Sequence, residues 1–263
     1  MTQFIVQGYP AYAYTGGREF DPARPAVVFV HGAAFDHSVW QWQSRALAHR
    51  GFTVLAVDLP GHGRSPGPLR HTIGGLADWL AGLLDAAMLE RAALVGHSMG
   101  SLVALETAIR VPHRISRLAL LGTALPMPVG EAFMAAAADA APESLDMEAV
   151  WGHARNVALA SSPVPGTSLL GASRALNGRA HAGVLHADLQ ACAAFTATAA
   201  SLAALPMPVL VLAGRRDQMT PHKAGGAVAD LVPGSTFASV DAGHAMMGEA
   251  PRAVLGALET FLR

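Results

Sequence analysis

The stretch Gly96-His97-Ser98-Met99-Gly100 separates an apolar, strand-like run at residues 92–95 from a helical pattern that extends to residue 110. Because its two glycines lack a Cβ atom, a strand and a helix can approach each other closely on either side of the serine. The amino end of the helix offers free N–H groups to a developing negative charge. In this strand-to-helix position the G-x-S-x-G pattern predicts a nucleophilic serine; the alternative is a serine that merely caps a helix.

Short apolar runs alternate with alanine- and leucine-rich stretches along most of the chain. The runs are apolar at successive positions, which is typical of strands that helices cover on both faces. Strands are expected over residues 4–6, 11–14, 26–30, 53–57, 92–95, 118–121, 209–212 and 236–240. Helices are expected over residues 40–49, 73–88, 99–110, 221–230 and 251–263. The alternation predicts an α/β fold with a mostly parallel sheet and right-handed crossovers, opened by a hairpin.

The alternation stops between residues 125 and 205. Helical patterns occur there over residues 131–140, 145–160 and 188–203, and no strand is expected. A segment this long inside a compact domain usually has structure or function of its own. We therefore expect a core made of residues 1–124 and 206–263, with residues 125–205 inserted as a helical cap after the fourth core strand.

A nucleophilic serine needs a base, and the base needs an acid that orients it. Asp217 follows the strand expected at residues 209–212, and His244 follows the strand expected at residues 236–240. Together with Ser98, both residues therefore lie at the carboxyl ends of parallel strands, the edge where open α/β sheets bind ligands. Asp241 is an alternative acid, but it is only three residues from His244, whereas such an acid normally comes from a separate loop.

Other loop residues at the same edge need roles. His31 and His62 compete with His244 as the base, whereas His97 is held inside the turn and cannot easily reach the neighbouring hydroxyl. A tight turn after the strand at residues 26–30 would direct backbone N–H groups into the cleft. We expect the N–H groups of Ala33 and Met99 to form an oxyanion hole; the alternative is a turn that only ends the strand.

These motifs, in this order, make the chain resemble the α/β-hydrolase superfamily in its form with a helical cap. The matching stretches are His31-Gly32, residues 58–65, residues 96–100, residues 214–217 and Gly243-His244. The resemblance covers nearly all of the chain outside residues 125–205. It implies a catalytic triad of Ser98, Asp217 and His244 and a structural loop at residues 58–65. A serine at position 98 departs from relatives with an aspartate nucleophile, such as epoxide hydrolases and haloalkane dehalogenases.

The composition narrows the function further. Hydrophobic residues make up 52% of the 263 residues and charged residues only 14%, against about 25% in ordinary soluble proteins. With 18 basic and 19 acidic residues the net charge is -1, so nucleic acid is not expected as a partner. The first residues lack the features of a signal peptide, and a cytoplasmic location is expected. No charge lies between Asp188 and Arg215, but prolines at 206 and 208 interrupt this stretch, so no membrane span is expected.

We expect neither a metal nor a cofactor, because no metal-ligand or phosphate-binding motif is present, and the single cysteine allows no intrachain disulfide. The expected substrate is a small or medium, largely apolar carboxylic ester. Residues available to contact it are Phe35, Phe133, Met134, Met147, Trp151, Phe195, Met219 and Met246. The same triad would also suit a lactone, a thioester, an amide, the C–C bond of a diketone or perhydrolysis, an acyltransferase, or a small-molecule receptor. The sequence carries no signal for the oligomeric state.

Overall fold

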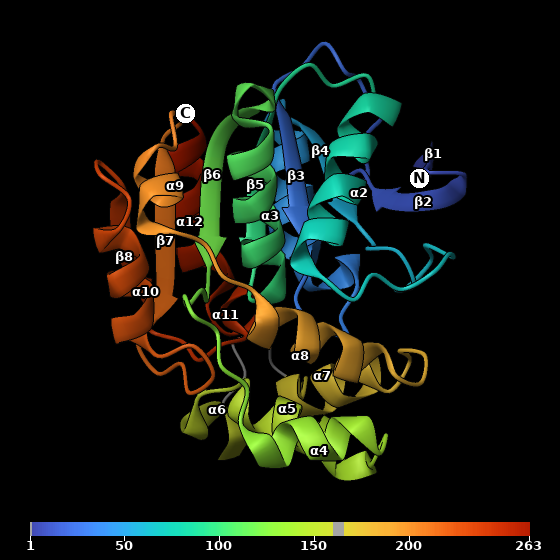
Figure 1. Cartoon of the computed structure of the whole chain (residues 1–263), viewed down its shortest axis with the longest axis vertical. Coiled ribbons are helices and arrows are strands. Elements are labelled where there is room, and N and C mark those ends of the chain that lie inside the picture. The colour runs from blue at the N-terminus through green and yellow to red at the C-terminus, as the bar shows by residue number, and fades with distance from the viewer. Residues whose placement is uncertain (1, 160–165) are drawn as a thin grey trace.

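The computed structural model describes residues 2–159 and 166–263. It contains one eight-stranded sheet flanked by helices (Figure 1). The strand order is β1-β2-β4-β3-β5-β6-β7-β8, and the neighbouring pairs from β4 to β8 are parallel. The strands are β1 (Thr2–Val6), β2 (Tyr9–Tyr14), β3 (Ala26–Val30), β4 (Thr53–Val57), β5 (Ala92–His97), β6 (Ile115–Leu121), β7 (Val209–Gly214) and β8 (Thr236–Val240). β1 and β2 form the expected hairpin and join β4 antiparallel. The predicted α/β fold with a mostly parallel sheet is confirmed.

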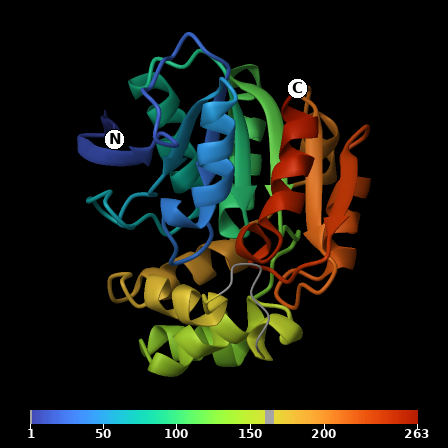
Figure 2. The same cartoon turned by 180° about the vertical axis from the view of Figure 1, so that it is seen from behind.

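Helices cover both faces of this sheet, as Figures 1 and 2 show from opposite sides. One layer holds α2 (Ile73–Ala86), α3 (Met99–Arg110) and α10 (His222–Asp230), and the other holds α1 (Gln41–His49) and α12 (Pro251–Leu262). Successive side chains of a strand point to opposite faces. Val28 and Val30 of β3 therefore pack in the cluster that contains α2 and α3, whereas Val27 and Phe29 pack with α1 and α12. Two buried faces explain why β3 is apolar at every position.

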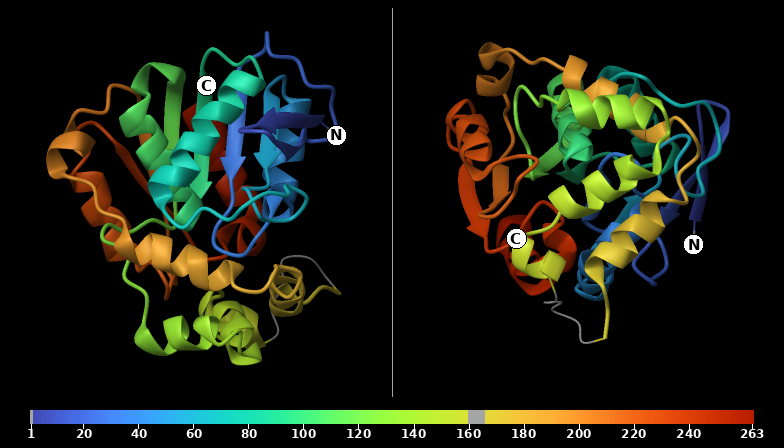
Figure 3. Two further views of the ribbon diagram at one scale, coloured as in Figure 1. Left: turned by 45° about the vertical axis from the view of Figure 1, so that its right-hand side comes forward. Right: turned by 90° about the horizontal axis from the view of Figure 1, so that it is seen from below.

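Between β6 and β7 the described residues form helices and no strand. These helices are α4 (Glu131–Ala138), α5 (Pro142–Trp151), α6 (Arg155–Leu159), α7 (Leu169–Asn177), α8 (Val184–Ala194) and α9 (Ala199–Ala203). In Figure 1 and in the left view of Figure 3, α4 to α8 lie beyond the carboxyl ends of the parallel strands, and in Figure 1 α9 lies beside the start of β7. The shorter elements of the core are η1 (His37–Trp40), η2 (Pro112–Arg114) and α11 (Met246–Glu249).

The helix expected at residues 145–160 is wrong as a single element, because it divides into α5 and α6. Long-range hydrogen bonds occupy the backbone groups at the break: Ala245 N–H donates to the Gly152 carbonyl, and Ala154 N–H donates to Glu249 Oε2. Residue 160, the end of that expected helix, lies outside the described residues. The helix expected at residues 188–203 is likewise two helices, since Thr198 caps α9 by accepting from the backbone N–H of Ser201.

One helix boundary and one whole helix of this segment also differ from expectation. α8 begins at Val184, four residues before the expected start, and α7 was not expected at all. The start of α7 is stabilised by Ser168, whose side chain accepts from the N–H of Gly171. A serine at the first position before a helix is a recognisable capping signal, so the sequence contained a local clue to α7.

In the described part of the chain, no helix is both long enough and apolar enough to cross a membrane. The uncharged stretch between Asp188 and Arg215 is divided among the end of α8, the short helix α9 and the buried strand β7.

Candidate active site

Ser98 lies between β5 and α3, in a turn with unusual backbone geometry. Its φ of 53° and ψ of −122° form a conformation that costs a serine on the order of 1–3 kcal/mol. A Cβ atom on Gly96 would overlap the carbonyl of Gly100, and a Cβ atom on Gly100 would overlap the carbonyl oxygen of His31. Both positions therefore require glycine, and this close packing holds Ser98 at the carboxyl edge of the sheet.

His244 and Asp217 form a buried pair at the same edge. His244 Nδ1–H donates to Asp217 Oδ2 over 2.8 Å, and the two side chains are 5% and 0% exposed. His244 comes from the loop after β8, and Asp217 from the loop after β7. Because Nδ1 carries the hydrogen of this bond, Nε2 of the neutral imidazole is left without one and can accept a proton.

Met219 and Thr220 donate further hydrogen bonds to the carboxylate of Asp217. Asp217 Oδ1 accepts from the backbone N–H groups of Met219 (2.9 Å) and Thr220 (2.8 Å), and Oδ2 accepts from Thr220 Oγ1 (2.8 Å). Burial raises the pKa of Asp217, but the charge of His244 and these hydrogen bonds outweigh burial, so the pKa is lower than usual. The acid therefore stays ionised. Thr220 was missed in the sequence, although its spacing of three residues from Asp217 is typical of a side chain that caps a turn.

Asp241, the alternative acid, lies elsewhere. Its carboxylate is 65% exposed and accepts from Arg216 Nη2 over 2.8 Å. The structure thus places Asp217, and not Asp241, against the imidazole of His244.

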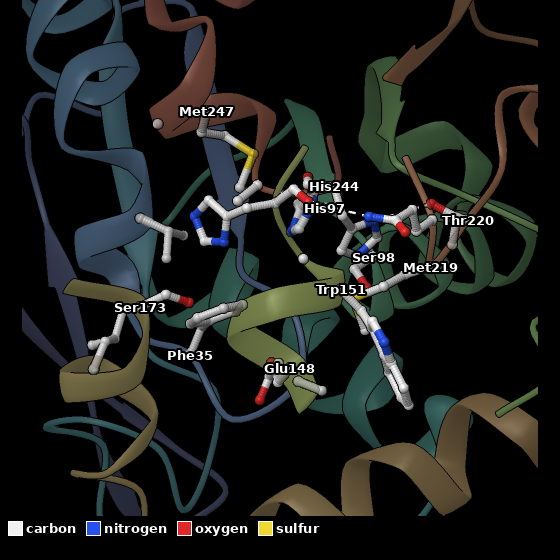
Figure 4. Close-up of a pocket in the computed structure, with 18 of the residues that line it drawn as sticks. Phe35, His97, Ser98, Glu148, Trp151, Ser173, Met219, Thr220, His244 and Met247 are labelled. Carbon is white, nitrogen blue, oxygen red and sulfur yellow. Dashed lines mark hydrogen bonds between the residues drawn. The ribbon is translucent and has the colours of Figure 1, made fainter. Parts of the chain in front are cut away.

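Ser98 and His244 line the same cavity, and Figure 4 draws them with their neighbours. His97 holds the backbone of His244, because its Nε2–H donates to the carbonyl of His244 over 2.9 Å. Burial, together with the positive charge of His244, lowers the pKa of His97 to about 3, so its ring is neutral. This arrangement agrees with the expectation that His97 does not serve as the base for Ser98.

The loop after β3 approaches the serine closely. A Cβ atom on Gly32 would lie 3.2 Å from the Cβ of Ser98, and Ala33 lines the cavity. His31 Nε2 accepts from the backbone N–H of Leu59. This bond joins the loop after β3 to the loop after β4, so the His31 ring stabilises loop structure and does not contact Ser98. For the part of the chain that the structure describes, no hydrogen bond is recorded to the N–H of Ala33. Its role in an oxyanion hole stays a prediction, as does that of Met99, the first residue of α3.

A second buried pair joins the core to α8. His62 Nε2–H donates to Asp188 Oδ2 over 2.8 Å, and the side chains are 2% and 1% exposed. The same oxygen accepts from the N–H of Ala34 over 2.9 Å, and Ala34 has a positive φ of 53°. Burial lowers the pKa of His62, but the Asp188 charge and hydrogen bond outweigh it, so the pKa is raised. Asp188, which was not anticipated, therefore stabilises the loop that carries Ala33.

Asp188→Asn is expected to lower the free energy of unfolding by about 3 kcal/mol at about pH 6, because it removes one partner of a buried ion pair. A raised histidine pKa contributes stability fully below the unfolded-state value of about 6.5 and loses that contribution as the pH rises through the folded-state value. The effect of the substitution should therefore shrink by about pH 9. Urea unfolding of both proteins at the two pH values measures it.

The matched control is Asp146→Asn on α5, whose carboxylate is 51% exposed and pairs with Arg174. It should change stability by less than about 0.5 kcal/mol at either pH. An equal loss for Asp188→Asn at both pH values would show that the His62 charge contributes nothing.

The cavity has a volume of about 550 Å³, within the usual range for small-molecule sites. Core loops and helices α4, α5, α7 and α8 all contribute to its walls. Of the side chains expected to contact substrate, four line it: Phe35, Phe133, Trp151 and Met219. Phe133 and Trp151 meet edge to face, with ring centroids 5.7 Å apart. Their contact with a substrate stays a prediction.

The other four expected contacts do not line the cavity. Met134 and Met147 pack against the main hydrophobic cluster, Phe195 is buried within it, and Met246 is fully buried near α12. Met247 lines the cavity in place of its neighbour, and Glu148 and Ser173 add polar groups that were not anticipated. Periodicity within a short helix cannot tell which of two adjacent methionines faces a cavity formed by distant segments.

One group of described residues has the spacing of metal ligands: Asp36, His37 and Asp58, whose ligand atoms lie within 4.8 Å of one another. Asp58 already accepts from the backbone N–H and Nδ1–H of His37 and from the backbone N–H of Arg64. These bonds join the loop after β4 to η1. The group is therefore explained by loop structure, in agreement with the expectation for residues 58–65.

The chain is similar in sequence and in structure to known proteins. A methyl ester esterase acting on pimeloyl-[acyl-carrier protein], from Methylococcus capsulatus, is 33% identical over 246 residues, covering 82% of this chain and 86% of that protein. A hydrolase from Pseudomonas aeruginosa PA01 superposes with a TM-score of 0.86 at 26% identity, covering 99% of this chain and 97% of that one. An enol-lactonase from Burkholderia xenovorans LB400 shares the fold, with a TM-score of 0.87, 24% identity and 99% coverage of both chains.

Several curated relatives match over a shorter stretch, and there this chain spans only about a quarter of the relative's length. The model of the family described as the alpha/beta hydrolase fold matches residues 25–251, which include the serine turn, Asp217 and His244. With the strand order and the serine turn described above, the chain belongs to the α/β-hydrolase fold family.

Proposed function

We propose that this protein is a serine hydrolase that cleaves a carboxylic ester through an acyl-enzyme on Ser98. The observation that carries the proposal is the buried His244–Asp217 pair, which opens on the same cavity as Ser98. An imidazole oriented by a buried carboxylate is what an uncharged hydroxyl needs to become a nucleophile near neutral pH.

The reaction follows from these positions. Ser98 Oγ attacks the ester carbonyl while His244 Nε2 takes the hydroxyl proton. The carbonyl oxygen becomes an oxyanion, which the N–H groups of Ala33 and Met99 would stabilise. The C–O bond to the alcohol then breaks, and His244 returns the proton to the departing alkoxide. Water attacks the acyl-enzyme with His244 again as the base, which releases the acid and restores Ser98.

The cavity supports a small or medium, largely apolar substrate. Aromatic and aliphatic side chains make up much of its wall, and about 550 Å³ suits a small molecule. Relatives named as a methyl ester esterase and as an enol-lactonase favour acyl–oxygen cleavage as the reaction class.

We propose that residues 125–205 act as a cap on a core made of residues 1–124 and 206–263. The position of α4 to α8 across the carboxyl edge of the sheet supports this division. Phe133 of α4 and Leu189 of α8 line the cavity and also belong to the hydrophobic cluster of the core. Such a cap would select substrates by shape.

Covalent labelling tests the nucleophile. A fluorophosphonate should label Ser98, and mass spectrometry of the digested protein locates the label. Ser38 and Ser173 line the same cavity and serve as internal controls, because neither lies in the turn between β5 and α3. Labelling at either control serine, or none on folded protein, would contradict the proposal.

A panel of chromogenic esters, lactones, thioesters and amides then identifies the bond. Turnover of esters and failure of the other bond types would support carboxylesterase activity. Turnover of lactones or thioesters alone would retain the triad but change the substrate class. Acyl transfer to an added alcohol in preference to water would identify a transferase.

A further inference from the structure

A buried carboxyl group on α5 has no role in the mechanism above. Glu148 is only 4% exposed, yet it lines the cavity that Ser98 also lines (Figure 4). The two residues come from different parts of the fold, since Ser98 follows the core strand β5 and Glu148 lies in the second helix after β6. A substrate held between them would contact both.

Glu148 lacks the hydrogen-bond partners that Asp188 and Glu249 have. Its Oε2 is buried and, within the described residues, makes no hydrogen bond, and no described cation pairs with the carboxyl group. Asp188 by contrast binds His62 and the N–H of Ala34, and Glu249 accepts from the N–H groups of Gly243 and Ala154. Burying a polar group without a partner costs about 1–3 kcal/mol. A leucine at this position would avoid that cost, so packing alone does not explain an acid here.

The charge around Glu148 defines what it can bind. Burial, reinforced by the negative charge of Asp188, raises the pKa of Glu148 well above its usual range. A carboxyl group in this state can both donate and accept a hydrogen bond. A carboxylate in the cavity would add a negative charge beside the two buried acids Glu148 and Asp188, whereas a ligand group that donates a hydrogen bond would give the Glu148 carboxyl group the partner it lacks.

The walls of the cavity restrict the rest of the ligand. Phe133, Trp151 and Leu189, from three helices, line it along with Glu148. A ligand that matches this surface is apolar over most of its length and carries one polar group away from the bond that Ser98 attacks. Glu148 would distinguish ligands by this group, because a site that hydrogen-bonds a substrate hydroxyl strongly rejects the analogue that lacks the hydroxyl.

We propose that Glu148 is a specificity-determining residue that hydrogen-bonds a donor group, a hydroxyl or a protonated amine, on the substrate portion remote from the scissile ester. This inference rests on the proposed ester hydrolysis at Ser98 and deepens it. The preferred substrate is thus an ω-hydroxy or ω-amino ester rather than the corresponding plain alkyl ester or ω-carboxy ester.

Chain-matched esters test the inference. Nitrophenyl esters of straight-chain acids of about four to eight carbons, ending in methyl, hydroxyl, amine or carboxylate, form one series, and acetate esters of the corresponding alcohols form a second. In the wild-type protein, kcat/KM for the hydroxyl- or amine-ended ester should exceed that for the methyl-ended ester at one chain length or more. The two donor end groups separate a neutral from a charged ligand.

Variants at position 148 assign the preference to the side chain. Glu148→Leu should lower the donor-to-methyl ratio of kcat/KM by about tenfold to a hundredfold, mainly through KM for the donor-ended ester. Glu148→Gln retains a donor and an acceptor and should restore the preference for hydroxyl. Glu143→Leu makes the same substitution at an exposed position of α5 and should leave every ratio unchanged.

The outcomes separate the two proposals. The inference is overturned if the ratio is the same in the wild-type and Glu148→Leu proteins in both series, or if all esters lose activity in equal proportion. Preference for the methyl or carboxylate end group in the wild type overturns it as well. Should Glu148→Leu fail to fold, loss of the hydroxyl preference in Glu148→Gln decides against it. Failure to cleave any ester, with Ser98 unlabelled, instead refutes the proposed hydrolase.

Discussion

Replacing Ser98 with alanine is expected to lower ester turnover by about 10⁶-fold, on the scale seen when a serine hydrolase loses its nucleophile. Without the hydroxyl no acyl-enzyme can form, and His244 has no proton to remove from position 98. The structure records no hydrogen bond to this hydroxyl from the residues it describes, so stability should change little. Steady-state turnover of a nitrophenyl ester, with a thermal unfolding curve beside it, measures both effects.

Ser173→Ala is the matched control for this substitution. Ser173 lines the same cavity from α7 and lies away from Ser98 and His244 in Figure 4. Its loss should leave kcat within about threefold of the wild-type value, as expected for a residue that takes no part in the chemical steps. A Ser98→Ala protein that keeps more than about 1% of the wild-type turnover would show that another group attacks the ester.

Asp217→Asn is expected to lower kcat by about 10⁴-fold, less than the loss of Ser98 itself. An amide at this position can present an N–H group to Nδ1 of His244, which favours the tautomer whose Nε2 is protonated and cannot act as a base. The side chain would keep its size, and its oxygen could still accept from the backbone N–H groups of Met219 and Thr220. The defect should therefore appear in kcat while the protein stays folded.

Asp241→Asn supplies the comparison, because it makes the same chemical change three residues before His244. The exposed carboxylate of Asp241 pairs with Arg216, and surface pairs of this kind contribute little. Turnover should stay within about twofold of wild type. A larger defect in Asp241→Asn than in Asp217→Asn would mean that the wrong acid has been assigned.

Much of the site was predictable because its parts follow strand ends. β5 and the turn at Ser98 are encoded by neighbouring residues, and the two glycines have a steric reason to be there. Asp217 and His244 are far from Ser98 in the sequence, yet parallel strands bring their carboxyl ends to one edge. The order of the strands alone therefore brings Asp217 and His244 close together.

The boundaries of the helices between β6 and β7 could not be predicted from the local sequence. Their composition indicated helices, but the break after Trp151 depends on a hydrogen bond donated by Ala245 and one accepted by Glu249, about a hundred residues away. The low content of charged residues likewise predicted apolar walls. Phe133 and Leu189 agree with that expectation, whereas the buried acid Glu148 does not.

Residue types and their local order thus account for the sheet, the serine turn and the candidate catalytic residues, because each depends on interactions within a few residues or on the common edge of parallel strands. The pairing of His62 with Asp188, the choice of Met247 over Met246 and the isolation of Glu148 depended on the three-dimensional packing. Each of these features arises where side chains from distant segments meet. Burial and charge at such meeting points are properties of the assembled helices and loops, and no single stretch of the chain encodes them.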